Sequence, residues 1–357
     1  MSKSIKSTNA VITIAAVVVI IFGMQAAKVL LVPFLLAIFF ALVTVRPMLW
    51  LQAHRVPSVL AAITVVFALM LFLATVGSIV GTSIGAFTAA LPDYQEQLNS
   101  LLQGSVQFVQ RFVDDDISLA NLMEFVDPGR AMGMAATLLN AMRGVLTNVF
   151  LIFFTMVFIL LEVSSVQVKA LAAFGRGADS FHRASLFLQN LGRYLGIKTA
   201  VSIVTGLIVG VMTWAIGLDF PLLWGMLAFL LNYIPTIGSI IAAVPAVMLA
   251  LIQLGPAEAA TTAMGFVGIN LVFGNIIEPR LMGFGVGISP LVIFVGLIFW
   301  GWVFGPVGML LSVPLTMTLK LALESDERTQ WIAILLGSES DAQHALAIRN
   351  QGEESSD

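Results

Sequence analysis

The chain has 357 residues, of which 59% are hydrophobic and 10% are charged, and its mean hydropathy is +1.00. Soluble domains carry about 25% charged residues, so this composition excludes a soluble globular protein. The net charge of −3 gives no basis for nucleic-acid binding, and the absence of cysteine excludes disulfides and thiolate chemistry. The apolar runs have the length that a helix needs to cross a bilayer, which predicts an all-α polytopic membrane protein with about seven to ten apolar segments.

The N-terminal region, 1–91, begins with two apolar runs, 10–27 and 29–49, which predict a helical hairpin with Lys28 near its apex. Basic residues flank both ends of the hairpin, so both ends are predicted to be cytoplasmic. The next run, 58–91, would be about 50 Å long as a single helix. Its glycines at every fourth position share one face, a spacing typical of closely packed membrane helices. They are Gly77, Gly81 and Gly85.

Residues 92–143 differ from the apolar runs because acidic residues outnumber basic ones. Apolar residues recur there at helical spacing, which predicts a small insertion of amphipathic helices. The insertion follows an odd number of spans, so we place it on the extracytoplasmic side. Its three consecutive aspartates, 114–116, favour a solvated helix start over a cation site.

Residues 144–198 hold another spanning run followed by a basic, amphipathic segment. Its excess of lysine and arginine predicts a cytoplasmic position. We interpret Lys198, at the end of this segment, as an interfacial anchor whose charge reaches the lipid headgroups. The alternative is that Lys198 reaches a substrate. The polar tail, 325–357, is predicted to be cytoplasmic as well.

The stretch NYIPTIGSIIAAVP (232–245) interrupts the apolar region 199–324, which we interpret as the transport core. A helix in lipid must satisfy its own backbone hydrogen bonds, and proline removes a donor and clashes with the preceding turn. Broken helices at membrane depth are where many transporters bind their substrates. The alternative is a plain turn near the membrane surface, where Pro, Gly and Asn are ordinary residues.

A second interrupted tract, 288–323, resembles the first in its order of proline and glycine. Paired interrupted segments indicate a transport site between them, although two apolar sequences rich in Pro and Gly can also resemble each other by chance. The sequence leaves open whether this tract crosses twice or is re-entrant. The predicted hinge residues of the two tracts are Pro235, Gly238, Pro245, Pro306, Gly308 and Pro314.

Between the two tracts lies the sequence INLVFGNIIEPRLMG. Asn270, Gly274 and Glu278 are spaced by four and share one face of an α-helix. Pro279 disfavours helical conformation at Glu278, which predicts that the helix ends there. Ionisable groups at membrane depth are costly and by default functional, so Glu278 and Arg280 are predicted to gate transport or carry coupling charge. The alternative is a cap at the membrane surface.

NYIPTIGSIIAAVP, INLVFGNIIEPRLMG and LIFWGWVFGPVGMLLSVPLTMTLKLALE together resemble the autoinducer-2 exporter family of bacterial transporters. The resemblance is strongest over 193–324. Ser239 makes it closest to the branch named for transport of the quorum-sensing signal autoinducer-2, because the wider family often has proline there. The resemblance implies a multi-pass permease of the bacterial inner membrane that moves the signal outward and forms a homo-oligomer.

Recognition of a small hydroxylated solute would need hydrogen-bonding side chains near the broken helices. The predicted solute-binding residues are Asn232, Thr236, Ser239, Asn270 and Asn275. Protons and sodium are the candidate coupling ions. One alternative is a sodium or lithium–proton antiporter that titrates Glu278. Another is a non-transporting membrane scaffold that assembles partners through the glycine series and the acidic insertion.

The sequence gives little support for an enzyme. GTSIG (81–85) matches the G-x-S-x-G pattern of serine hydrolases, but that pattern needs a strand-to-helix turn and lies here in an apolar helix. The three histidines lie in polar segments, so Ser83 has no base. We predict no catalytic residue, no metal site and no cofactor.

Overall fold

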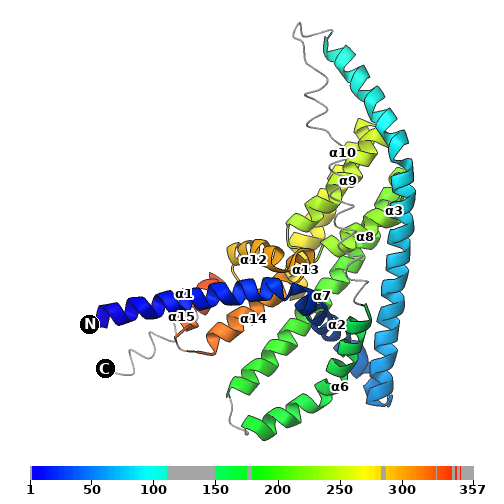
Figure 1. Cartoon of the computed structure of the whole chain (residues 1–357). Helices are drawn as coiled ribbons and strands as arrows, with labels where there is room; N and C mark the ends of the chain where they lie inside the picture. Colours follow the sequence, from blue (N-terminus) through cyan, green and yellow to red (C-terminus); the bar gives the residue numbers. More distant parts are fainter. Residues whose placement is uncertain are drawn as a thin grey trace. The chain divides into compact units, whose positions relative to one another are not determined.

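The computed structural model describes residues 2–110, 149–174, 179–282 and 287–339 except 327, together with 342, 343 and 346. Within these residues every regular element is a helix, which confirms the predicted all-α class (Figure 1). Most of the acidic insertion and the end of the tail lie outside the described residues. The helices are α1 (Ser2–Ala26), α2 (Lys28–Ala53), α3 (Ser58–Gln110), α6 (Val149–Phe174), α7 (Asp179–Ile216), α8 (Pro221–Leu231), α9 (Ile237–Gln253), α10 (Pro256–Ile269), the π-helix η1 (Asn270–Ile277), α11 (Glu278–Met282), α12 (Pro290–Phe304), α13 (Pro306–Leu310), α14 (Ser312–Glu324) and α15 (Gln330–Leu336).

Helices that fit a bilayer make up most of the described chain. Four stretches are long and apolar enough to cross a membrane: Lys28–Ala53, Ser58–Phe87, Leu186–Ile216 and Pro256–Met282. Five shorter apolar helices accompany them: Ala15–Ala26, Val149–Glu162, Pro221–Leu231, Ile237–Gln253 and Pro290–Phe304. Large apolar side chains on these helices are exposed, such as Phe150 at 80% and Val29 at 76%, as expected for surfaces that contact lipid. The chain is therefore a multi-pass membrane protein.

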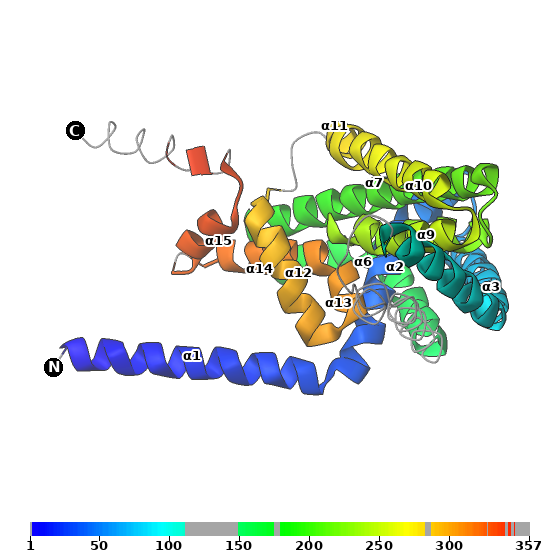
Figure 2. The same cartoon turned by 90° about the horizontal axis from the view of Figure 1, so that it is seen from above.

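The chain divides into two compact units. The first unit comprises Met1–Val66, Val145–Leu195 and Gly285–Asp357, and the second comprises Phe67–Gly144 and Gly196–Phe284. In the first unit α2 packs along α6, and α12 turns back through α13 onto α14. In the second unit α9 packs against α8 and against α10 (Figure 1). Figure 2 shows α9 beside α10 from above. The second unit contains the candidate site.

Two helices continue through points where the composition changes. α3 does not end near residue 91 but runs through Pro92 to Gln110, and α7 is one helix on both sides of the predicted boundary at 198. The change in composition therefore marks a change of surroundings and not the end of a helix.

Beyond the apolar part of α3, the hydroxyl of Tyr94 donates a hydrogen bond of 2.7 Å to Asp219. Burial, together with this bond, raises the pKa of Tyr94, so the phenol stays neutral.

Both interrupted tracts form hairpins of short helices. At 1.5 Å per residue, the 11 residues of α8 and the 15 of α12 span only about 16 and 22 Å, less than the roughly 30 Å of a hydrocarbon core. α8 packs against α9, and α12 packs against α14. These lengths are shorter than a full crossing and favour re-entrant hairpins.

Glycines allow the close approaches in these hairpins. A Cβ at Gly238 would collide with the carbonyl oxygen of Leu231, and a Cβ at Gly308 would collide with that of Trp300. Where α7 crosses α8, a Cβ at Gly225 would lie 2.6 Å from the carbonyl oxygen of Gly206. The glycine series of α3 differs, because a Cβ at Gly81 would have no atom within 4 Å. Its predicted role in packing stays a prediction.

The hinge residues predicted from the sequence do not all lie at breaks. The first break covers residues 232–236, which include Pro235, and α9 then continues through Pro245. In the second tract Gly305 ends α12, Pro306 begins α13, and Pro314 lies in the first turn of α14. A proline in a first turn lacks only an N–H that would have no helical partner anyway. Pro245 is the exception, since it is buried inside a continuous helix.

Candidate functional site

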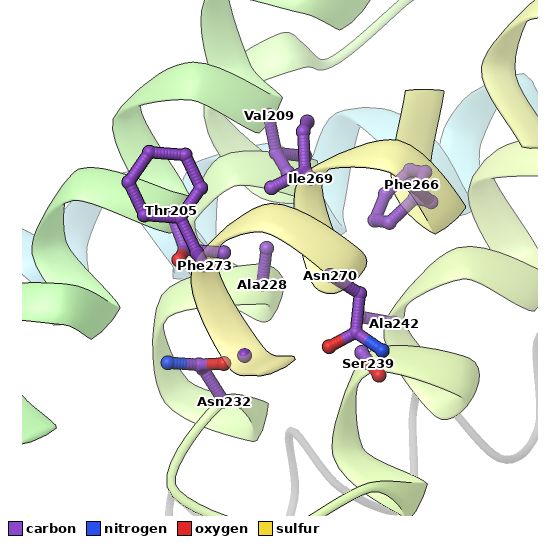
Figure 3. A pocket seen from close by; sticks show the side chains of 11 residues that line it. Thr205, Val209, Ala228, Asn232, Ser239, Ala242, Phe266, Ile269, Asn270 and Phe273 are labelled. Carbon is purple, nitrogen blue, oxygen red and sulfur yellow. The ribbon is translucent and has the colours of Figure 1, made fainter. Parts of the chain in front are cut away.

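Three elements of the second unit meet at the first break: α7, the turn at 232–236, and η1. A π-helix is rare, and where it occurs it is frequently part of a functional site. A pocket of about 20 Å³ lies between these elements (Figure 3). Its polar lining residues are Thr205, Asn232, Ser239 and Asn270, and apolar side chains such as Phe266 complete the wall. The arrangement places hydrogen-bonding groups inside apolar surroundings.

Three of the predicted solute-binding residues come together here. Asn232, the C-cap of α8, donates from Nδ2 to Ser202 Oγ at 2.9 Å. Ser239, in the first turn of α9, donates to the carbonyl oxygen of Thr236 at 3.1 Å. Asn270 begins η1 and projects toward Ser239 (Figure 3). Gly274 makes room for this side chain, because a Cβ there would lie 3.0 Å from Asn270 Oδ1.

The other two predicted solute-binding residues are placed differently. Thr236 is exposed and is the N-cap of α9, with φ 62° and ψ −54°, a positive φ that is unusual for a β-branched residue. Asn275 is exposed on η1. Neither side chain lines the pocket, so their part in solute binding remains a prediction.

A polar face of α7 completes the site, and the sequence reasoning missed it. Ser202 accepts the hydrogen bond from Asn232, and Thr199 accepts one of 2.8 Å from the Tyr233 hydroxyl. Thr205 lines the pocket one turn beyond Ser202. The sequence contains a signal for this polar face, because Ser202 and Thr205 follow Lys198 at helical spacing within an apolar span.

Thr205 carries a buried hydroxyl without a hydrogen bond. Its residue is 8% exposed, and Oγ1 has no hydrogen-bond partner among the described residues. A threonine in a helix usually donates to the carbonyl one turn back, as Thr213 does to Val209 at 2.9 Å. A buried unsatisfied polar atom calls for an explanation. Among the described residues Gln52 and Ser312 also hold such atoms, but only Thr205 lines this pocket.

An ion pair joins α7 to α11, the short helix that continues from η1. Lys198 Nζ is 2.7 Å from Glu278 Oε1 and 2.8 Å from Oε2, and the two side chains are 6% and 15% exposed. This placement corrects our interpretation of Lys198 as an interfacial anchor, because the ammonium is buried against a carboxylate. It also leaves Glu278 largely buried beside Lys198, while Arg280 is exposed.

The helix does not end at Glu278, contrary to the sequence-based expectation. Glu278 has helical dihedral angles, φ −57° and ψ −51°, and it begins α11. Pro279 is the second residue of α11, so the helix continues from η1 through this proline without a break. The π-helix before it changes which residues share a face, because its hydrogen bonds join residues five apart. The α-helical spacing of four that we applied to Asn270 and Glu278 therefore does not describe η1.

These observations define a multi-pass membrane protein with a polar site at a broken helix, the arrangement of a membrane transporter. The chain belongs to the AI-2E family of transporters, whose family model matches residues 11–326. It is 40% identical over 343 residues to the AI-2 transport protein TqsA of Escherichia coli K12, covering 94% of this chain and 98% of the relative. It is 38% identical over 348 residues to a putative transport protein of Haemophilus influenzae, covering 96% and 99%. It is 35% identical over 326 residues to the putative transport protein YhhT of Escherichia coli K12, covering 91% and 93%.

Proposed function

We propose that this transporter exports autoinducer-2, or a similar small hydroxylated solute, and that the solute binds between α7, the 232–236 turn and η1. The unpartnered hydroxyl of Thr205 beside Asn232 and Asn270 is the observation that carries the proposal. Buried polar groups gain most from a partner that replaces their lost water. The 40% identity to a protein named for AI-2 transport supports the choice of solute.

Binding requires that the site opens. A volume of about 20 Å³ holds roughly one water molecule, so a sugar-like solute does not fit the pocket as it stands. Pro235 lies in the turn that forms one wall, Gly238 lies in the first turn of α9 just after it, and the irregular η1 forms another wall. We propose that movement of these two walls admits the solute. The predicted hinge at the first break would then serve to open the pocket. The same proposal includes a position in the bacterial inner membrane, cytoplasmic termini and a homo-oligomer.

Proteoliposomes that contain only this protein test the function. When they are loaded with autoinducer-2, efflux should exceed that of protein-free liposomes. Asn232→Ala and Asn270→Ala should each lower the efflux rate by about tenfold, since each loses a hydrogen bond to the solute. Asn232→Ala also leaves the Ser202 hydroxyl without its donor. Asn190→Ala is the control, because Asn190 is exposed on α7 away from the pocket. Normal efflux from both pocket variants at equal protein levels would refute the site.

Thr205→Val should separate binding from folding. Valine has nearly the same shape, so it removes the unsatisfied hydroxyl and should leave the melting temperature unchanged or slightly higher. The KM for the solute should rise about fivefold, the equivalent of one hydrogen bond of roughly 1 kcal/mol. Thr213→Val is the matched control, because that buried hydroxyl already bonds within α7 and should leave the KM unchanged. An unchanged KM in Thr205→Val would remove Thr205 from the site.

A further inference from the structure

The Lys198–Glu278 pair stands apart from the other ion pairs of the described residues. Both side chains lie in stretches that can span a membrane, Leu186–Ile216 and Pro256–Met282, and both are largely buried. The pair of Lys169 and Glu162 is 68% and 50% exposed. In the pair of Lys320 and Glu324, the carboxylate side chain is 43% exposed.

A carboxylate that is largely buried in a membrane protein needs a positive charge beside it. Without one, the buried charge is costly and the group takes up a proton. The charge can come from a dissolved cation such as sodium or from a side chain. Lysine suits the second role, because its ammonium is a compact point charge with three donors.

The geometry leaves the carboxylate with a cation already in place. Nζ donates to both oxygens of Glu278, at 2.7 and 2.8 Å, so the ammonium occupies the position between them where a small cation would coordinate. A sodium ion in the same position would place two positive charges a few ångströms apart in a medium of low dielectric constant, which is strongly unfavourable. Sodium and the ammonium are therefore alternatives at this carboxylate.

We propose that Lys198 is the built-in counter-ion of Glu278, that it takes the place of an inorganic monovalent cation, and that solute movement by this protein is therefore independent of sodium. The inference deepens the proposed function, because it names what occupies the coupling site. It also argues against the sodium–proton antiporter considered from the sequence.

The first test needs no transport and uses the purified full-length chain. Melting temperatures are compared in sodium chloride and in choline chloride at equal ionic strength. The wild type should melt at the same temperature in both salts. Lys198→Met removes the ammonium and leaves an unbranched side chain of similar length, so sodium can then reach Glu278. Sodium should therefore raise the melting temperature of this variant by about 3 °C or more relative to choline. Lys198→Met/Glu278→Gln should lose this sodium response.

The second test measures efflux of autoinducer-2 from proteoliposomes in the same two salts. Wild-type efflux should be equal in both. Efflux by Lys198→Met should be slow in choline and about tenfold faster in sodium, because sodium restores the missing charge. Lys169→Met is the control, since it removes a lysine from an exposed pair and should change neither measurement.

Three outcomes would overturn the inference. The first is a sodium response of the wild type in either test. The second is no sodium response of folded Lys198→Met in both tests, and the third is a sodium response that persists in the double variant. If Lys198→Met does not fold, Lys198→Gln serves in its place, because its amide can still donate to the carboxylate. If the wild type shows no efflux of autoinducer-2, the proposed cargo is wrong, and the melting experiment alone decides the role of Lys198.

Discussion

Replacing Gly238 by alanine is expected to disrupt the α8–α9 hairpin and to lower the free energy of unfolding by about 3 kcal/mol or more, at the upper end of the cost of overpacking. The added Cβ would collide with the carbonyl oxygen of Leu231 and would lie 3.1 Å from Cβ of Ile234. Neither neighbour can turn away as a flexible side chain could. Thermal unfolding in detergent, followed by size-exclusion chromatography, measures the loss.

A glycine in open space provides the matched control for this substitution. A Cβ at Gly81 would meet no atom within 4 Å, so Gly81→Ala should be stabilising by a few tenths to about 1 kcal/mol, the usual gain in a helix. Gly308→Ala should behave like Gly238→Ala, because its Cβ would collide with the carbonyl oxygen of Trp300. If Gly238→Ala melted at the same temperature as Gly81→Ala, Gly238 would not lie as close to the carbonyl oxygen of Leu231 as the structure places it. Parallel losses at Gly238 and Gly308 would support the similarity of the two tracts.

The sequence predicted the class of fold and the place of the first break because both depend on local chemistry. Long apolar runs fix the membrane class, and proline at 235 with glycine at 238 marks the turn. It did not predict that α3 continues past residue 91 or that α7 continues through residue 198, because polar residues at a membrane surface change the surroundings of a helix without breaking it. It did not predict the π-helix either, since the sequence of residues 270–277 is equally compatible with an α-helix.

The polar face of α7 was missed for a different reason. Ser202 and Thr205 lie at helical spacing in an apolar span, but the role of Ser202 depends on Asn232, which lies thirty residues away in sequence. Lys198 was interpreted by its likeness to lysines that reach the membrane surface. Its partner, Glu278, is separated from it by 80 residues. Pairings between distant helices depend on how those helices pack, and a single sequence does not contain that information.

Removing one charge from the buried pair is the second large effect that we expect. Glu278→Gln should lower the free energy of unfolding by about 3–5 kcal/mol, because it leaves the Lys198 ammonium buried without a counter-ion. Lys198→Met should have a similar cost in choline chloride, where no sodium can fill the site. The double variant Lys198→Met/Glu278→Gln removes both charges, so it should cost far less than the sum of the single variants. Denaturation of the four proteins in choline chloride gives the coupling energy.

The exposed pair provides the contrast for this cycle. Lys169→Met and Glu162→Gln should show no measurable coupling, because both side chains are exposed to solvent in this structure. Additive losses at Lys198 and Glu278 would show that the two charges do not depend on each other, and the pair would then explain neither the stability nor the proposed independence of sodium. A double variant that regains stability but moves no solute would show that the charges act in the transport cycle, because the loss of transport could no longer be attributed to unfolding.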